Sequence, residues 1–204
     1  AFGVIVTWIW TGTALVPEKK EKDIGLGVTL PLYASGPASV GWWAMFITML
    51  GDMTAYIALV FGYFFYWTVH ADFPPANLPG PGIVWPATGG VLLLGAWVAT
   101  MIARRMNRRD RRGPFYASLL LAAVLASGGG IALAAGPYLA GMAPTVLHVA
   151  VGVIMQLYCL LRRWAGRMTA EYEIDIANVE LYWHFTALTV LIAVAVIAGF
   201  PLVV

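Results

Sequence analysis

Residues 42–67 read WWAMFITMLGDMTAYIALVFGYFFYW, and this stretch decides the fold of the chain. At ~1.5 Å per residue, a helix of about 26 residues is long enough to cross a bilayer with some tilt. Tryptophans stand at both ends of the stretch, where amphipathic rings settle at the membrane–water interface. The stretch therefore predicts a transmembrane helix, and it carries one carboxylate, Asp52, inside it.

Asp52 is the residue of this helix that most needs an explanation. A charge near the bilayer centre costs roughly 2.5–3.5 kcal/mol on insertion scales, so it needs a partner or a proton. Asp52 lies about 15 Å from the inner end of the predicted helix. Thr48 and Tyr56 share its face at four residues' distance and are expected to be able to hydrogen-bond to it. Two interpretations stay open: a carboxylate that handles protons or organises lipid, and a protonated packing residue.

Composition excludes an ordinary soluble domain. Hydrophobic residues make up 61% of the chain and charged residues 11%, and the mean hydropathy is +0.80. A soluble domain carries about 25% charged residues, so the chain is predicted to be an integral membrane protein. The single cysteine, Cys159, allows no internal disulfide and no thiolate metal cluster.

The apolar runs predict an all-α fold, a polytopic membrane helix bundle of five full transmembrane helices plus a partial N-terminal helix. Ala1–Val16 is too short to span and is expected to be the tail of a helix that starts earlier. Residues 1–29 form this partial helix and a linker, and residues 30–204 form the membrane domain. Full spans are expected at residues 42–67, 83–103, 114–135, 145–161 and 180–200, with a loop at 25–41 and a turn at 136–144. The triplet Gly128–Gly130 predicts either close helix packing or a local bend.

The positive charges predict the orientation. All twelve Lys and Arg lie in three clusters, at residues 19–22, 104–112 and 162–167, and these clusters fall in alternate loops. The positive-inside rule puts these loops in the cytoplasm, so the C-terminus is expected outside. Basic clusters beside span ends favour anionic lipid head groups over nucleic acid as their partner.

Two histidines inside spans raise the possibility of haem. Counted from the inner ends of the predicted spans, His148 lies about 20 Å deep and His184 about 6 Å. Axial ligands of one haem must lie at nearly the same depth, so these two are predicted not to share one, while a single-ligand haem stays open. A neutral histidine hydrogen-bonded between helices is the favoured interpretation. The sequence contains no zinc spacing, phosphate loop or nucleophile motif, so no metal site and no catalytic residue is assigned.

Three segments of the chain carry a family resemblance. The last span opens with NVELYWHF at residues 178–185, the first full span holds an acid in an aromatic-rich helix, and residues 147–163 read LHVAVGVIMQLYCLLRR. In order and spacing these segments resemble the WHF helix, the helix with a buried glutamate and the penultimate helix of haem-copper oxidase (cytochrome c oxidase) subunit III. The resemblance covers nearly everything from Leu30 onward. Residues 29–37, TLPLYASGP, are similar to the linker of bacterial chains that fuse subunits I and III, which would make Ala1–Val16 a remnant of subunit I.

The chain also departs from this family. Asp52 stands in place of the family's glutamate and is one methylene shorter, so its proton or hydrogen-bond role is altered. Thr145 stands near the place of a histidine that usually precedes the His-Val pair. Five full spans in place of seven resemble the short bacterial form, so the lipid cleft to which the two extra helices contribute is in doubt.

The resemblance implies a non-catalytic accessory subunit of a terminal oxidase in the bacterial inner membrane. Such a subunit flanks catalytic subunit I, binds phospholipid, and supports proton uptake and stability in aerobic respiration; haem and copper are expected in partner subunits and not in this chain. The chain would be part of an oxidoreductase complex of the cytochrome c oxidase type and is expected to carry no active site itself. The alternatives are an accessory subunit of a nitric oxide reductase or quinol oxidase, and a proton-coupled transporter that uses Asp52. Five spans without a visible repeat disfavour the transporter.

Two sets of site residues follow from this interpretation. The proton-handling or buried polar set is Asp52, His148, His184, Glu180, Tyr56 and Thr48, and the lipid-binding set is Arg104, Arg105, Arg162, Arg163 and Trp183. Asp52 and His148 are expected at similar depths, and each is costly if it is unpaired in a dry interior. We therefore predict a direct or one-water hydrogen bond between them, which makes the first and fourth full spans neighbours.

Overall fold

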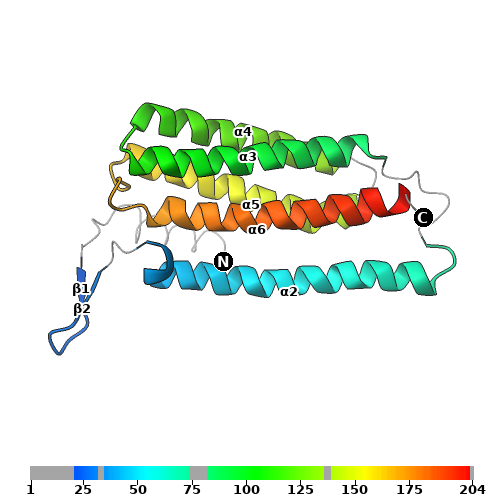
Figure 1. Cartoon of the computed structure of the whole chain (residues 1–204), viewed down its shortest axis with the longest axis horizontal. Coiled ribbons are helices and arrows are strands. Elements are labelled where there is room, and N and C mark those ends of the chain that lie inside the picture. Colours follow the sequence, from blue (N-terminus) through cyan, green and yellow to red (C-terminus); the bar gives the residue numbers. More distant parts are fainter. Residues whose placement is uncertain (1–20, 32–34, 74–81, 136–138, 203–204) are drawn as a thin grey trace, which may run out of the picture.

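Five long helices make up most of the described part of the protein (Figure 1). The computed structural model describes residues 21–31, 35–73, 82–135 and 139–202. The helices, each followed along the chain in Figure 1, are α2 (Val40–Val69), α3 (Val84–Arg108), α4 (Arg112–Ala135), α5 (Leu139–Trp164) and α6 (Ile174–Ala193). All five are long and apolar enough to cross a membrane, with α6 continued to Gly199 by a π-helical segment. This confirms a multi-pass, all-helical architecture, and the expected partial helix at Ala1–Val16 lies outside the described residues.

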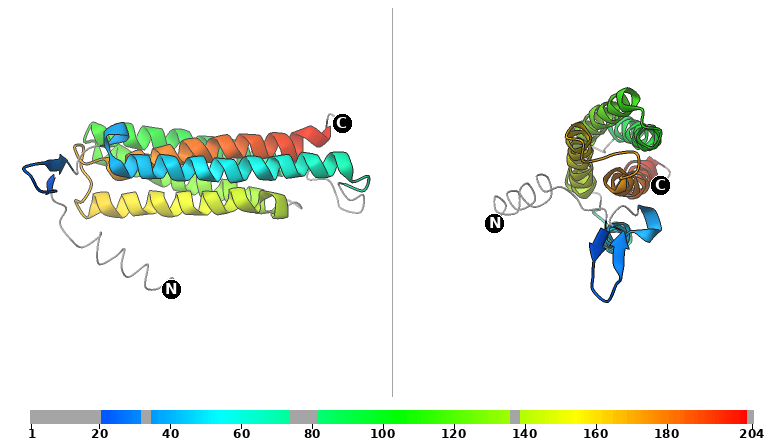
Figure 2. Two further views of the ribbon diagram at one scale, coloured as in Figure 1. Left: turned by 90° about the horizontal axis from the view of Figure 1, so that it is seen from below. Right: turned by 90° about the vertical axis from the view of Figure 1, so that its left-hand side faces the viewer.

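Four of the helices close into a ring. Helix α3 packs along α4, α4 along α5, α5 along α6, and α6 returns to α3. The end-on view in Figure 2 shows α3 and α4 as one layer and α5 and α6 as the next. The buried side chains of the ring form one apolar core, whose largest members include Trp183, Phe115, Leu93 and Leu119.

Helix α2 lies outside this ring. It packs against α6 and buries only Met49 and Tyr56 among its thirty residues. Its N-terminus is capped by Ser39, whose hydroxyl accepts from the backbone N–H of Trp42 at 3.4 Å. Large apolar side chains such as Phe46, Ile57 and Phe61 are exposed on its remaining surface. In Figure 1, α2 runs alone below α6.

The α3–α4 contact is the closest in the protein, and glycines make it possible. A Cβ placed on Gly129 would lie 2.6 Å from Cγ of Leu93, and one on Gly89 would lie 2.7 Å from Cδ2 of Leu133. Each of these glycines also approaches the other's carbonyl oxygen, at 3.1 Å from the same added Cβ. The glycine triplet therefore serves close helix packing, one of the two uses that the sequence predicts.

Several helix ends differ from the sequence-based expectation. Helix α3 continues through Arg108, so half of the expected basic loop is helical, because basic side chains near a helix C-terminus interact favourably with its dipole. Helix α5 begins at Leu139 and contains Pro144, where a turn was expected. Helix α6 begins at Ile174, six residues before the expected start.

The expected loop at residues 25–41 also contains more structure than predicted. Strands β1 (Glu21–Asp23) and β2 (Thr29–Pro31) pair antiparallel, and η2 (Gly36–Ala38) is a short 3-10 turn that leads into α2. The tip of the hairpin uses positive φ angles at Gly25, Leu26 and Gly27. Leu26 is an unusual residue for that conformation. Residues 21–29 of the hairpin are exposed.

Candidate functional site

The predicted meeting of Asp52 and His148 is present. Oδ2 of Asp52 on α2 lies 3.5 Å from Nε2 of His148 on α5, at the outer limit of a direct polar contact. The two side chains are 43% and 24% exposed, so the pair lies at the edge of the bundle and not in its centre. The two helices meet at this pair, whereas α2 packs mainly against α6. The two helices are thus neighbours at this pair, as expected, although the broad contact of α2 is with α6.

The second ring nitrogen of His148 decides how many protons the pair holds. Nδ1 of His148 lies 2.7 Å from the carbonyl oxygen of Pro144, one turn earlier in α5. A carbonyl oxygen only accepts, so Nδ1 carries a hydrogen and donates it. In a neutral imidazole Nε2 is then an acceptor, and an ionised carboxylate is an acceptor too. The contact is attractive only when one proton lies between Nε2 and Oδ2, either on Asp52 or on a charged His148.

Tyrosines fix the helices that carry this pair. The hydroxyl of Tyr182 donates to the carbonyl of His148 at 2.8 Å, and the hydroxyl of Tyr56 donates to the carbonyl of Thr189 at 2.8 Å. Tyr182 therefore ties α6 to α5, and Tyr56 ties α2 to α6. Thr48 donates to the carbonyl of Ala44 within α2. The expectation that Thr48 and Tyr56 could bond Asp52 is wrong, because each hydroxyl has a backbone carbonyl as its partner.

His184 makes a separate polar contact on the other side of α6. Nε1 of Trp97 on α3 donates to Nδ1 of His184 at 2.7 Å. Since Nδ1 accepts, the hydrogen of a neutral His184 ring resides on Nε2. His184 is solvent- or lipid-exposed in this chain, and its neighbour Trp183 is fully buried.

The early start of α6 changes the depth of His184. Ten residues separate His184 from Ile174, so it lies about 15 Å from the start of α6, and His148 lies about 24 Å from the end of α5 at Trp164. The expected depth of about 6 Å for His184 is therefore wrong, and the depth difference shrinks to about 9 Å. That these histidines do not share a haem stays a prediction. Among the described residues, no three His, Cys, Asp or Glu side chains are grouped as metal ligands.

An ion-pair cluster forms at the end of the bundle where α3 finishes and α6 begins. Arg108 contacts both carboxylate oxygens of Glu173, with Nε 2.8 Å from Oε2 and Nη2 2.7 Å from Oε1. Arg104 lies between two acids: its Nη2 is 3.1 Å from Glu173 and its Nη1 pairs with Glu180. The hydroxyl of Ser35, just before α2, donates to Glu173 at 3.1 Å. One carboxylate thus joins α3, the start of α6 and the segment that leads into α2.

Glu173 is charged in this cluster although its side chain is only 4% exposed. Burial alone would raise the pKa of the Glu173 carboxyl, but the hydrogen bonds and positive charges of Arg108 and Arg104 outweigh it and hold the pKa below its ordinary value. The carboxylate form is therefore the stable one at neutral pH.

Three of the five predicted lipid contacts are corrected by the structure. Arg162 is buried with Nε 2.8 Å from Asp175, and Arg163 is buried, donating to the carbonyl of Met168 at 3.0 Å and pairing with Asp110. Trp183 lies in the core against Gly152, where a Cβ would come 3.0 Å from its ring. These three side chains face the protein and not lipid. Arg104 is occupied by acids, and Arg105 is exposed.

Residues that the sequence interpretation missed complete these contacts. The predicted site residues did not include Glu173, Arg108 or Trp97. They also did not include a buried hydrogen bond between α5 and α3, which Nε2 of Gln156 donates to the hydroxyl of Thr100 at 2.9 Å. For Glu173 a signal was present, because an acid directly before an apolar run and opposite a basic cluster is a candidate ion-pair partner. Trp97 carries no such signal, since its role depends on which helix faces α6.

These features define a class of protein: a multi-pass membrane helix bundle with a carboxylate–imidazole pair at the edge of its apolar core. In comparisons with protein-family models and with curated proteins, the sequence matches none.

Proposed function

We propose that the chain is an accessory subunit of a bacterial haem-copper terminal oxidase, in which it flanks the catalytic subunit and supports proton uptake. The sequence resemblance to subunit III supports this assignment, and its three segments lie on α2, α5 and α6, the helices that meet around Asp52 and His148. Haem and copper would belong to the partner subunits.

The observation that carries the proposal is the 3.5 Å contact between Oδ2 of Asp52 and Nε2 of His148. A group that must hold one proton between two sites, and that is partly exposed at 43% and 24%, is suited to accept and release that proton. It can serve as a proton reservoir beside a proton-consuming partner. A pair whose role is to stabilise the fold is more often fully buried, because burial protects its hydrogen bond from competing water.

The exposed face of α2 supports the need for a partner subunit. Trp43, Phe46, Phe61 and Phe65 are all exposed along this helix. Aromatic side chains are enriched in protein interfaces, and among the described helices α2 packs broadly only against α6. We therefore assign this face of α2 to contact with the catalytic subunit.

The orientation proposed for the complex follows the positive charges. The ends of α3 and α5 carry arginines, and both ends lie on the same side of the bundle as the starts of α4 and α6. With this side in the cytoplasm, the C-terminus faces outward and the Asp52–His148 pair lies near mid-membrane.

Affinity purification tests the assignment. The tagged chain, isolated from its native membranes in mild detergent, should co-purify with haem and copper in fixed ratio to a larger membrane subunit. The chain separated from its partners should show no haem Soret band. Purification of a haem-free assembly would contradict the oxidase and favour a transporter built around Asp52, which proton-coupled uptake in vesicles would then detect.

A further inference from the structure

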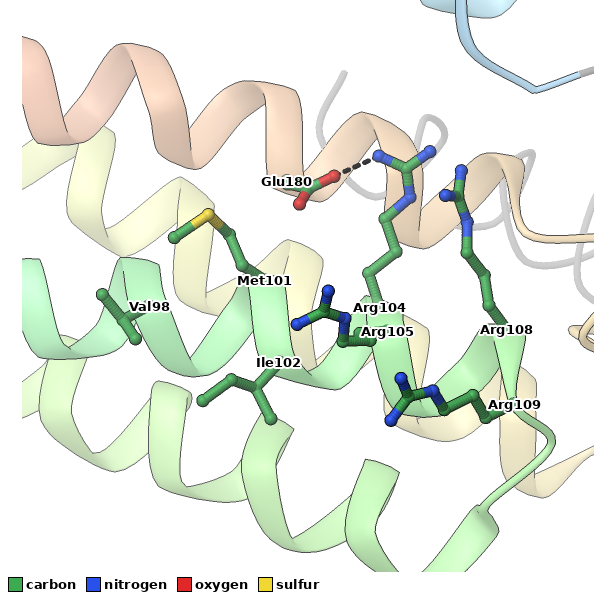
Figure 3. A pocket seen from close by; sticks show the side chains of 8 residues that line it. All are labelled: Val98, Met101, Ile102, Arg104, Arg105, Arg108, Arg109 and Glu180. Atoms are coloured by element: carbon green, nitrogen blue, oxygen red, sulfur yellow. Dashed lines mark hydrogen bonds and ion pairs between the residues drawn. The ribbon is translucent and has the colours of Figure 1, made fainter.

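A groove runs along the exposed side of α3, beside Glu180 of α6 (Figure 3). Its volume is about 590 Å³. The part nearer the middle of the helix is apolar and is formed by Val98, Met101 and Ile102. The part nearer the helix end is formed by arginines. From Val98 to Arg109 the groove follows about 16 Å of helix.

The arginines of the groove are not equivalent. In Figure 3, Arg104 points toward Glu180 on α6, and Arg108 projects on the same side of α3. These two are neutralised by Glu180 and Glu173. Arg105 and Arg109 point the other way, over the groove, and both are exposed.

Arg105 and Arg109 leave the groove with two uncompensated positive charges. They are four residues apart on one face of α3, so their guanidinium groups can reach a common ligand. Among the described residues, no acidic side chain forms an ion pair with either. The four arginines of the groove and the two acids that pair with them give a net charge of +2.

We propose that this groove binds an anionic phospholipid of the adjacent leaflet. Its phosphate would lie between Arg105 and Arg109, which donate to phosphate oxygens in the fork geometry of guanidinium groups. The first part of an acyl chain would cover Val98 and Ile102, both exposed. A free phosphate ion would satisfy the arginines but leave this apolar half uncovered, so the combination favours a lipid.

This proposal is independent of the oxidase assignment, because it requires only that α3 spans the membrane. It also replaces the sequence-based set of lipid contacts with a different one. Arg105 is kept, Arg109 is added, and Arg104 acts as a support whose charge is already paired. The fixed ion pairs of Arg104 and Arg108 hold the upper wall of the groove in place.

Native mass spectrometry of the full chain in detergent tests the proposal. The protein is titrated with phosphatidylglycerol, with phosphatidylcholine and with inorganic phosphate in separate series. We expect phosphatidylglycerol to be retained at one site in preference to phosphatidylcholine. In the double variant Arg105→Gln/Arg109→Gln, binding of phosphatidylglycerol should weaken about 30-fold, from roughly 1 kcal/mol per arginine near a membrane surface.

Two further variants make the result specific. Arg111→Gln/Arg112→Gln removes two positive charges at the same end of the bundle, but from residues outside the groove. This control variant should keep the preference for phosphatidylglycerol over phosphatidylcholine. Arg105→Lys/Arg109→Lys keeps both positive charges but removes the guanidinium groups, so it should retain part of the preference for phosphatidylglycerol. This variant separates loss of lipid binding from loss of folding. The proposal is overturned if Arg105→Gln/Arg109→Gln binds phosphatidylglycerol as tightly as the wild type does. It is also overturned if the control Arg111→Gln/Arg112→Gln loses as much affinity as the groove variant. It is also overturned if inorganic phosphate competes as well as the lipid, or if neither lipid is retained, which would leave this face to a partner protein.

Discussion

Two substitutions of Asp52 distinguish the hydrogen bond of the Asp52–His148 pair from the titratable proton of the carboxyl group. In Asp52→Asn the amide N–H can still donate to Nε2 of His148, because Nδ1 keeps its hydrogen bonded to the carbonyl of Pro144. The contact survives without a titratable proton. In Asp52→Leu, Nε2 faces an apolar side chain and loses its donor.

The size of the effect follows from burial. An unsatisfied buried acceptor costs about 1–3 kcal/mol. His148 is 24% exposed and Asp52 43%, so the cost belongs at the lower end, about 1 kcal/mol. For a chain of this size that corresponds to a fall in Tm of roughly 2–4 °C. We therefore expect Asp52→Leu to melt about 2–4 °C below Asp52→Asn, with the Asn variant close to the wild type.

Two measurements check this reasoning. Thermal unfolding of the purified variants in one detergent gives the difference in Tm. Nitrogen NMR of the imidazole should report a hydrogen on Nδ1 of His148 in the wild type and in Asp52→Asn. The one-proton argument fails if Nδ1 carries no hydrogen, and the pairing argument fails if the Leu and Asn variants melt at the same temperature.

Three further predictions concern other contacts. Gly129→Ala should lower stability by about 1–2 kcal/mol, since overpacking outweighs the gain in helix propensity, whereas Gly51→Ala, which meets nothing within 4 Å, should be neutral or stabilising in the same thermal assay. The pKa of Glu173 is lower in the folded than in the unfolded protein, so its carboxylate stabilises the fold fully above the unfolded pKa of about 4.3. This stabilisation is lost as the pH falls through the folded pKa. In Glu173→Gln, the free energy of unfolding measured against pH should no longer show this loss. Trp97→Phe removes the donor to His184, so nitrogen NMR should show His184 changing from one tautomer to a mixture, and an unchanged ring signal would contradict the assigned bond.

The sequence predicts the spans well because their signal is local. Each of the five helices contains an apolar run of sufficient length, and each predicted span lies almost wholly inside an observed helical segment. The pairing of Asp52 with His148 was also predictable, because two polar groups at similar depths in apolar helices lower their free energy by meeting.

The helix ends were less predictable because they depend on contacts between helices. Arg108 continues α3 beyond the apolar run since Glu173, 65 residues later, neutralises it. Hydropathy predicts that a membrane helix ends where charged residues begin. Here Arg104 and Arg108 are paired with acids of the same protein, so the helix continues through them. Pro144 was read as part of a turn, yet membrane helices tolerate proline where neighbouring helices satisfy the freed groups.

The same limit explains the corrected lipid contacts. Arg162 and Arg163 look like span-end arginines in the sequence, but Asp175 and Asp110 draw them into the protein. Trp183 looks like an interfacial tryptophan until α6 is extended to Ile174, which moves it away from the helix end and into the core. In each case the deciding neighbour is distant in the chain.

The position of α2 outside the ring has a consequence for biosynthesis. Helices α3 and α4 are joined by a short connection and can associate as soon as both are inserted, but the main neighbour of α2 is α6, more than 100 residues later. During synthesis α2 must therefore wait in the bilayer with Asp52 unpaired, at a cost of roughly 2.5–3.5 kcal/mol for a charge near the bilayer centre. The contact between Asp52 and His148 can relieve this cost only after α5 has been inserted.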